Sequence, residues 1–77
     1  MYASDKKKIL VKIGQNIRAL RQQREMSQQM LASLCDFEKS NMSRIEAGRS
    51  NVTVFTLYKI AKALNASLSE LVNISES

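Results

Sequence analysis

Residues 27–48, SQQMLASLCDFEKSNMSRIEAG, constrain the fold most strongly, because they predict two short helices joined by a tight turn. Ser27 is a good N-cap for a first helix over about 28–34, since its hydroxyl can accept a hydrogen bond from a free backbone N–H. Asp36 suits the turn because Asp tolerates left-handed backbone. The apolar residues of the first helix recur at helical spacing and predict one inward face formed by Met30, Leu31 and Leu34.

The second predicted helix runs from about residue 39 to residue 47 and buries Met42 and Ile45. Gly48 can end it with a left-handed C-cap. Burying the other face would strand two cations, at several kcal/mol each, so that face must meet water or a polar partner. In such an arrangement the second helix can enter the DNA major groove. The polar face consists of Lys39, Ser40, Asn41, Ser43 and Arg44.

The composition fits one all-α domain. Seventy-seven residues suffice for a single core, and we expect no appended ligand-sensing domain. The absence of proline and the 44% of hydrophobic residues favour helices. One cysteine, Cys35, and no histidine argue against a disulfide or a zinc site and indicate a reducing compartment, the cytoplasm. We expect no membrane association, because no apolar run approaches the length of a membrane span.

The net charge of +5 is concentrated at the N-terminus, where the first 26 residues hold seven Lys or Arg and two acidic residues. Such an excess on one helix suggests a phosphate-facing surface, and the simpler alternative is a solvated helix face. Ser4 can cap this helix near Asp5, and the helix is expected to reach about Arg24. Gly14 lies inside it, at a cost of about 1 kcal/mol relative to Ala. Its predicted buried stripe is Ile9 or Leu10, Ile13, Ile17 and Leu20.

A polar loop follows residue 48, and its backbone N–H groups and short side chains can hold a phosphate at Arg49, Ser50 and Asn51. The next helix is expected to begin from a cap at Thr53 or Thr56 and to end at Asn65. Its apolar residues recur with a 3.6-residue period at Leu57, Ile60, Ala61 and Leu64. Ser67 can cap a short fifth helix that carries Leu68, Leu71 and Val72.

Four separated motifs resemble the XRE family, the Cro or phage-repressor type of helix-turn-helix transcriptional regulators. They are IRALRQQR (17–24), SQQMLA (27–32), SRIEAG (43–48) and TLYKIAKAL (56–64). The resemblance implies a compact five-helix bundle of the lambda-repressor-like DNA-binding type over residues 14–72. Residues 1–13 would be a basic N-terminal extension, which is part of the first helix, a separate arm or disordered. Lys6, Lys7 and Lys8 would then add phosphate contacts or simply solubilise the chain, and residues 73–77 would form a C-terminal tail.

The resemblance also implies roles for individual residues. Base edges would be read by Lys39, Ser40 and Arg44, while Asn41 would pair with adenine or meet phosphate. Arg21 and Glu46 would form a structural ion pair between the first and third helices. Phosphate contacts would come from Gln28, Gln29, Ser43, Arg49, Ser50 and Asn51. A homodimer contact would come from Phe55, Leu71, Val72 and Ile74, and the alternative is that all four belong to the core.

The sequence departs from the family pattern at two positions. Asp36 stands where glycine is common, and Glu38 stands where a small hydroxyl cap is common. Glu38 also brings negative charge near the expected phosphates, so it bears on how Lys39 is placed on the DNA.

The expected function is therefore that of a sequence-specific regulator that binds double-stranded DNA as a homodimer on a pseudo-palindromic operator. Restriction–modification controllers, phage-type repressors and antitoxins all fit this description. The competing interpretation is a protein-interaction adaptor or toxin-neutralising module with the same fold, for which the basic face of the third helix would be unnecessary. We expect no enzyme, because no carboxylate pair, phosphate-binding glycine loop or metal-ligand spacing is present. We also expect no cofactor, metal or small-molecule ligand.

Overall fold

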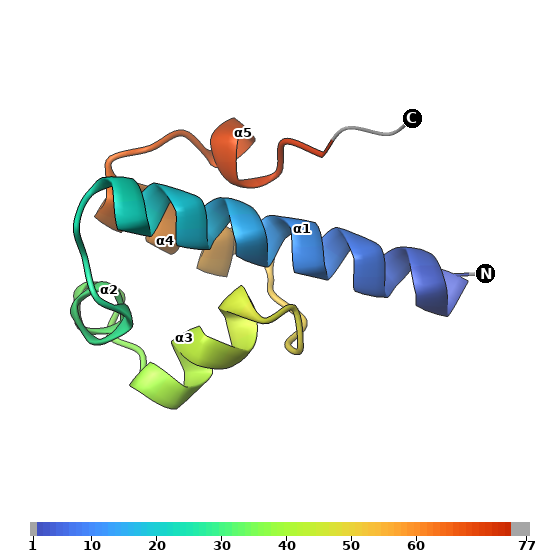
Figure 1. Ribbon diagram of the computed structural model, residues 1–77, viewed down its shortest axis with the longest axis horizontal. Helices are drawn as coiled ribbons and strands as arrows, with labels where there is room; N and C mark the ends of the chain where they lie inside the picture. Colours follow the sequence, from blue (N-terminus) through green and yellow to red (C-terminus); the bar gives the residue numbers. More distant parts are fainter. Residues whose placement is uncertain (1, 75–77) are drawn as a thin grey trace.

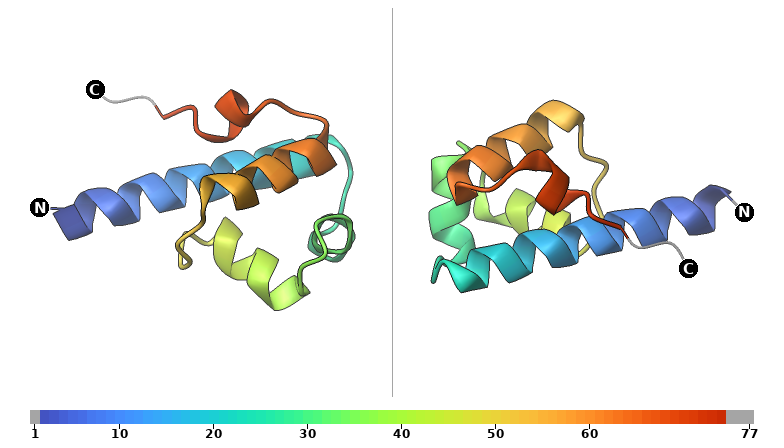
Figure 2. Two further views of the ribbon diagram at one scale, coloured as in Figure 1. Left: turned by 180° about the vertical axis from the view of Figure 1, so that it is seen from behind. Right: turned by 90° about the horizontal axis from the view of Figure 1, so that it is seen from above.

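Five helices make up the computed structural model, which describes residues 2–74 and the side chains from residue 5 onward. They are α1 (Tyr2–Gln23), α2 (Gln28–Leu34), α3 (Lys39–Glu46), α4 (Val54–Leu64) and α5 (Leu68–Leu71). Helix α1 spans the long axis of the molecule, with α2 and α3 on one side of it and α5 on the other (Figures 1 and 2). The described part contains no strand, and the predicted all-α fold is confirmed. Met1 and residues 75–77 of the predicted tail lie outside the described residues.

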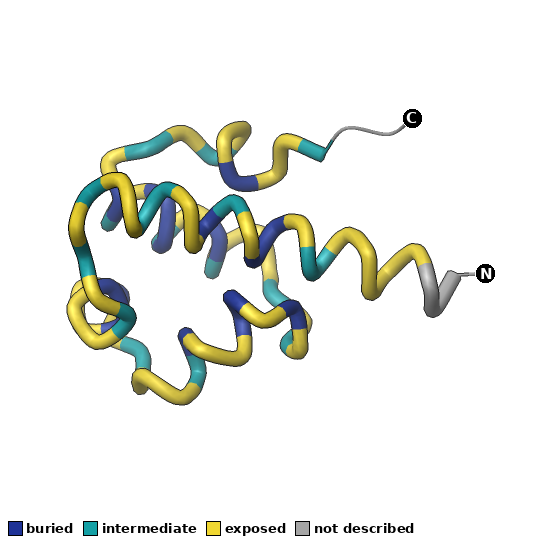
Figure 3. Tube along the Cα trace, in the orientation of Figure 1, coloured by how far each residue is buried: buried dark blue, intermediate teal, exposed yellow. Residues whose placement is uncertain are grey.

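Helix α1 is longer than predicted. It begins at Tyr2 rather than near Asp5, so Ser4 lies inside the helix and is not its N-cap. Residues 2–13 therefore form the N-terminal half of α1, and the helix projects beyond the bundle with residues 5–9 exposed (Figure 3). The other helices cover the rest of α1 from the end of this half onward, and they bury Ile13 and Ile17. The basic N-terminal residues therefore belong to a helical segment that continues directly into the part of α1 that packs in the core.

The boundaries of α2 and α3 agree closely with the sequence prediction. The Ser27 hydroxyl accepts a hydrogen bond from the Met30 amide at 3.0 Å, and Asp36 has a φ of 61° in the turn. Helix α3 ends at Glu46, one residue before the predicted end, and Gly48 follows with a φ of 73°. Local capping and turn chemistry therefore place both helices correctly.

The predicted inward face of α2 is confirmed at Leu31 and wrong at Met30 and Leu34. Met30 and Leu34 are 50% and 58% exposed, whereas the residues turned to the core are Leu31, Ala32 and Cys35. A helix of seven residues is too short for its own periodicity to distinguish these two stripes. The contacts that α2 makes with α3 and α4 decide which stripe is buried.

Two glycines allow α1 and α3 to approach at backbone distance. A Cβ at Gly14 would lie 2.7 Å from the carbonyl oxygen of Ile45 and 2.7 Å from the carbonyl carbon of Glu46. A Cβ at Gly48 would lie 2.7 Å from the Cα of Val11, and the positive φ of Gly48 independently favours glycine. Gly14 is therefore required by packing, which its helix propensity alone did not reveal.

Side-chain caps bound α4 and α5. Thr53, rather than Thr56, caps α4, because the Thr53 hydroxyl accepts a hydrogen bond from the Thr56 amide at 3.0 Å. Asn65 ends α4 in the left-handed conformation with a φ of 54°. The Ser67 hydroxyl caps α5, which ends at Leu71, so Val72 lies outside the helix.

The core lies between α1 and the other four helices and includes side chains from each of them. The largest fully buried side chains are Ile17, Leu31, Cys35, Met42, Ile60, Leu64 and Leu71. The prediction that Leu71 forms a dimer contact is wrong, because α5 turns this side chain into the core. Asn16 of α1 fixes this arrangement by donating to the Leu71 carbonyl oxygen at 2.9 Å. Ile74 also packs against the core, whereas Phe55 and Val72 remain exposed.

Candidate nucleic-acid interface

The face of α3 that points away from the core carries the predicted base-reading side chains. Lys39, Ser40 and Arg44 are all exposed. Ser43, which was predicted to meet phosphate, lies on the same exposed face, because it is one helical turn from Lys39 and Ser40. Asn41 is half-buried and occupies the margin of this face. The structure therefore brings together two cations and two hydroxyls, with one amide at their edge.

The N-terminus of α3 has no side-chain cap. Glu38 occupies the N-cap position, where its backbone carbonyl accepts from the amides of Asn41 and Met42 at 3.0 and 3.2 Å, but its carboxylate caps nothing. The first two N–H groups of the helix, those of Lys39 and Ser40, therefore remain available to solvent or to a ligand. The exposed Glu38 carboxylate would repel an anion at this end of α3. Any attraction for an anion must therefore come from the cations Lys39 and Arg44.

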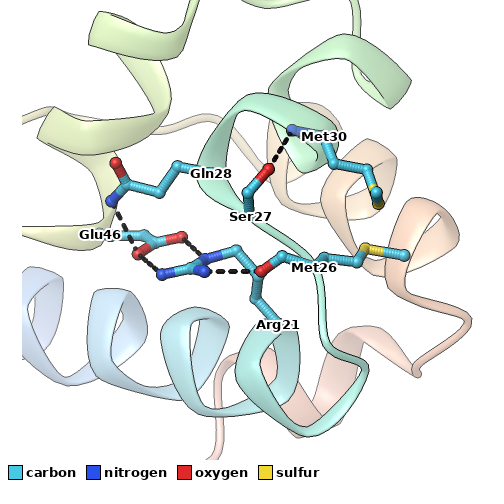
Figure 4. Close-up of polar contacts among 6 residues, drawn as sticks. All are labelled: Arg21, Met26, Ser27, Gln28, Met30 and Glu46. Atoms are coloured by element: carbon cyan, nitrogen blue, oxygen red, sulfur yellow. Dashed lines mark hydrogen bonds and ion pairs between the residues drawn. The ribbon is translucent and has the colours of Figure 1, made fainter.

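A buried ion pair fixes the orientation of α3. Arg21 Nε donates to Glu46 Oε2 at 2.7 Å, and Arg21 Nη2 donates to Glu46 Oε1 at 3.1 Å (Figure 4). The two side chains are only 11% and 3% exposed. Arg21 Nη1 also donates to the Met26 carbonyl oxygen at 2.7 Å. This bidentate geometry is the strong form of an ion pair, and it joins α1, the loop before α2 and the end of α3.

Gln28 belongs to the same network. Its Nε2 donates to Glu46 Oε1 at 3.0 Å, so the side chain predicted to meet phosphate is half-buried and already has a protein partner (Figure 4). Gln29, one position further on, is exposed. The Ser27 cap uses the Met30 amide, so the earlier amides of this helix end can still face an anion. Gln29 and these amides are therefore better placed than the Gln28 side chain for a phosphate.

The loop after α3 presents the remaining predicted phosphate ligands. Arg49 and Asn51 are exposed, and Ser50 is half-buried with its hydroxyl donating to the Asn51 carbonyl oxygen at 3.3 Å. The Arg49 amide donates to the Arg44 carbonyl oxygen at 2.9 Å, which ties the start of the loop to α3. Arg49 therefore has a backbone that is tied to α3 and an exposed side chain beside the end of that helix.

Arg24 has a structural role that sequence reasoning missed. Its Nε donates to the carbonyl oxygen of Leu64, and its Nη1 donates to the carbonyl oxygen of Leu20 at 3.3 Å. Carbonyl groups at the end of a helix lack intrahelical partners, so Arg24 caps α4 from the turn that follows α1. No local pattern could have revealed a contact between residues 40 positions apart. Together with Arg21, it removes two cations from the predicted phosphate-facing surface of α1.

An exposed aromatic pair stands at the start of α4. Phe55 and Tyr58 are 68% and 47% exposed, and their rings stack with centroids 6.4 Å apart and an interplanar angle of 22°. Val54 beside them is also 68% exposed. The sequence prediction of a dimer contact included Phe55 but not Tyr58. The predicted core residues of α4 form a complete apolar stripe without Tyr58, so its position attracted no prediction. These three are the exposed large apolar side chains of α4.

The single cysteine is a core residue. Cys35 is 1% exposed, and burial raises the pKa of its thiol, an effect that the nearby Lys59 charge partly offsets. Lys59 itself lies over the Phe37 ring, with its Nζ 4.9 Å from the ring centroid. Among the described residues, no group of three or more His, Cys, Asp or Glu could hold a metal ion. The helices of that part also include none that is long and apolar enough to cross a membrane.

Comparison with known proteins identifies the family. The chain matches the helix-turn-helix family over residues 17–71. It is 38% identical over 60 residues to the uncharacterized HTH-type transcriptional regulator y4dJ of Sinorhizobium fredii, a match that covers 78% of each protein. It is 34% identical over 64 residues to control protein C.MunI of Mycoplasma sp, covering 82% of this chain and 86% of that protein.

A solved structure gives the same result. The restriction-modification controller protein C.AhdI from Aeromonas hydrophila superposes on this chain with a TM-score of 0.78 and 39% sequence identity. The match covers 80% of this chain and 94% of that one. The two helices that the sequence placed at residues 27–48 thus lie within a fold shared with a known controller. The chain belongs to the helix-turn-helix family of DNA-binding transcriptional regulators, as the resemblance predicted.

Proposed function

We propose that this regulator binds double-stranded DNA as a homodimer on a pseudo-palindromic operator, with α3 of each protomer in the major groove. The observation that carries the proposal is the donor-rich outer face of α3, held on a helix whose other side is buried and whose end is locked by the Arg21–Glu46 ion pair. A helix fixed in this way can present the same side chains to every operator. Rigid presentation is what sequence-specific recognition requires.

The base-reading role falls to the exposed face of α3. Lys39 and Arg44 can each donate to O6 and N7 of guanine, and a good bidentate contact discriminates against the wrong base by about 1–3 kcal/mol. Ser40 lies between them and can contact either a base or a phosphate. Asn41 has a smaller role in this proposal, because it is half-buried at the margin. We therefore expect guanine within each half-site.

Phosphates on either side of the groove would position the protein. The N-terminus of α2 supplies Gln29 and backbone amides, with Gln28 oriented by Glu46. The loop after α3 supplies the exposed side chains of Arg49 and Asn51, with Ser50 between them. Ser43 lies on the outer face of α3, where it would meet phosphate or base according to the depth of the helix in the groove.

The dimer would form through the apolar surface at the start of α4. Phe55, Tyr58 and Val54 together expose the aromatic and aliphatic area that marks many protein contacts. Val72, which was also predicted from the sequence to form the dimer contact, is 39% exposed and therefore stays in the proposal. Leu71 and Ile74 belong to the core. A two-fold axis through such a contact would place two α3 helices on successive major grooves, about one turn of DNA apart.

The names of similar proteins favour one biological role. C.MunI is named a control protein and C.AhdI a restriction-modification controller, and both are matched over most of their length. We propose a role of this kind in the cytoplasm, where the reduced thiol of Cys35 would be stable. The proposal assigns no catalytic step to the chain.

Selection from a random duplex library tests the proposal, followed by binding of the selected and a scrambled duplex across about 50 to 300 mM salt. We expect a two-fold symmetric, guanine-containing sequence that is bound roughly a thousandfold tighter than the scrambled duplex. Equal and equally salt-sensitive binding of both duplexes would show only nonspecific phosphate attraction. That result would refute the proposal and favour a protein partner for the same fold.

A further inference from the structure

A hollow on the protein surface forms where the projecting half of α1 passes the loop after α3. Its lining residues are Lys6, Lys7, Leu10, Gly48, Arg49 and Asn51. The two segments are held together at its base, because Gly48 packs against the backbone of Val11. Lys7 lies one helical turn before Val11 and therefore directly beside the loop. The position of the hollow follows from rigid contacts between two helices and a short loop.

The hollow is cationic. Three of its lining residues, Lys6, Lys7 and Arg49, are positively charged and exposed, and no carboxylate lines it. Asp5, the acidic residue nearest in sequence, lies about 160° around the helix from Lys7 and lines a neighbouring hollow with Lys6, Ile9 and Leu10. Asn51 adds a neutral amide donor at the rim. Several cations and an amide around a concave surface match the chemistry of a phosphate group.

We propose that this hollow is a phosphate clamp, in which Lys6 and Lys7 of α1 act with Arg49 to hold a phosphate of the DNA backbone outside the bases read by α3. The inference rests on the proposed DNA-binding function and extends the footprint of the protein by a contact from the first helix. Because the lysines stand on a continuous helix, their backbone needs no ordering when DNA binds, unlike that of a disordered arm.

The same helix offers a matched control. Lys8 and Lys12 lie about 100° and 140° around α1 from Lys7, and they line a separate hollow with Lys7 that contains no residue of the loop after α3. The double variants K6Q/K7Q and K8Q/K12Q remove the same charge from the same helix at exposed positions. Each lost phosphate contact should reduce the steepness of log affinity against log salt by about 0.9. Over the tenfold range from about 1 M to 0.1 M salt, this corresponds to about eightfold weaker binding at the lower salt. K6Q/K7Q should show this loss, and K8Q/K12Q should show much less.

The decisive experiment replaces single phosphates of the selected duplex by neutral methylphosphonates and measures binding by the wild type and both variants. We expect at least one flanking phosphate whose neutralisation weakens the wild type and K8Q/K12Q several-fold but weakens K6Q/K7Q much less, because only Arg49 of the clamp remains in that variant. Circular dichroism should show the same melting temperature for all three proteins, because the substituted side chains are exposed.

Two results would overturn the clamp while leaving the proposed function intact. In one, both double variants lose the same affinity for the selected duplex. In the other, K6Q/K7Q remains as sensitive as the wild type to every neutralised phosphate. If the wild type itself fails to distinguish the selected duplex from the scrambled one, the proposed function fails, and the clamp fails with it.

Discussion

Replacing Gly14 by alanine separates the effect of helix packing from that of helix propensity. Propensity alone predicts that Gly14→Ala stabilises the protein by about 1 kcal/mol, because glycine is that much less favourable than alanine inside a helix. The structure predicts the opposite sign. The new Cβ would lie 2.7 Å from the carbonyl carbon of Glu46, at least about 0.8 Å inside the optimum carbon–carbon separation of about 3.5 Å.

The expected magnitude follows from what can move. Helix α3 cannot simply withdraw from α1, because Glu46 is held by Arg21 and Gln28 at the point of contact. Overpacking usually costs about 1–3 kcal/mol, and contact with backbone rather than with a flexible side chain places Gly14→Ala at the upper end. After subtraction of the propensity gain, we expect a net loss of about 2 kcal/mol in the free energy of unfolding. For a domain of this size, the melting temperature should fall by about 8–16 °C.

Urea unfolding followed by circular dichroism measures this loss, at one protein concentration for every variant. Ala19→Gly is the control, because position 19 is exposed on the same helix and reports propensity without packing. The control should lose about 1 kcal/mol. A Gly14→Ala protein as stable as the wild type, or more stable, would show that the α1–α3 contact is looser than described and would refute the packing argument.

Three further predictions test the interface, the dimer and the core. Arg44→Ala should relax the preference at one or two base positions, whereas Arg49→Ala should weaken all duplexes similarly and lower the salt slope by about 1; identical behaviour in binding assays would refute this division. Phe55→Arg should shift sedimentation toward the monomer, and Leu34→Arg, at another exposed apolar position on α2, should not. Because burial raises the pKa of the Cys35 thiol above 9.0, the folded state keeps its proton where the unfolded chain loses it. The free energy of unfolding should therefore be retained below about pH 9 and fall above it. Urea unfolding at about pH 7 and 10 should show this fall, and Cys35→Ala should remove the part of it that is due to the thiol.

Local chemistry made most of the helix boundaries predictable. Ser27 and Ser67 accept first-turn amides, Asn65 adopts the left-handed conformation, and Gly48 closes α3, all of which depend on residues within one turn. The ends of α2 and α4 were therefore placed closely from the sequence. The start of α1 was not, because Ser4 and Asp5 form a plausible cap that the longer helix does not use.

Contacts between distant segments were less predictable. The buried face of α2 depended on its contacts with α3 and α4, and the Arg24 contact with Leu64 joins the turn after α1 to the end of α4, two segments that share no sequence signal. An apolar residue such as Leu71 suits a core and a dimer contact equally well. Only its burial in the folded protomer shows that it belongs to the core. The candidate base readers were easier, because an amphipathic helix must expose its charged face and Lys39 and Arg44 had no alternative direction.

The geometry of α3 is set by contacts that do not involve DNA. A helix of eight residues is unstable alone, so its shape depends on its buried face, on Gly14 and on the Arg21–Glu46 ion pair. In the proposed complex, DNA binding would therefore need to order mainly the side chains of Lys39 and Arg44, not the backbone that carries them.

Arg21→Ala should therefore weaken specific DNA binding although Arg21 does not face the groove. The variant leaves a Glu46 carboxylate that is 3% exposed with only Gln28 as a side-chain partner, and the free energy of unfolding should fall by about 3 kcal/mol. Urea unfolding and binding to the selected duplex should show both losses together. If affinity fell while stability stayed unchanged, Arg21 would have to contact DNA directly, and its role as the anchor of the recognition helix would be wrong.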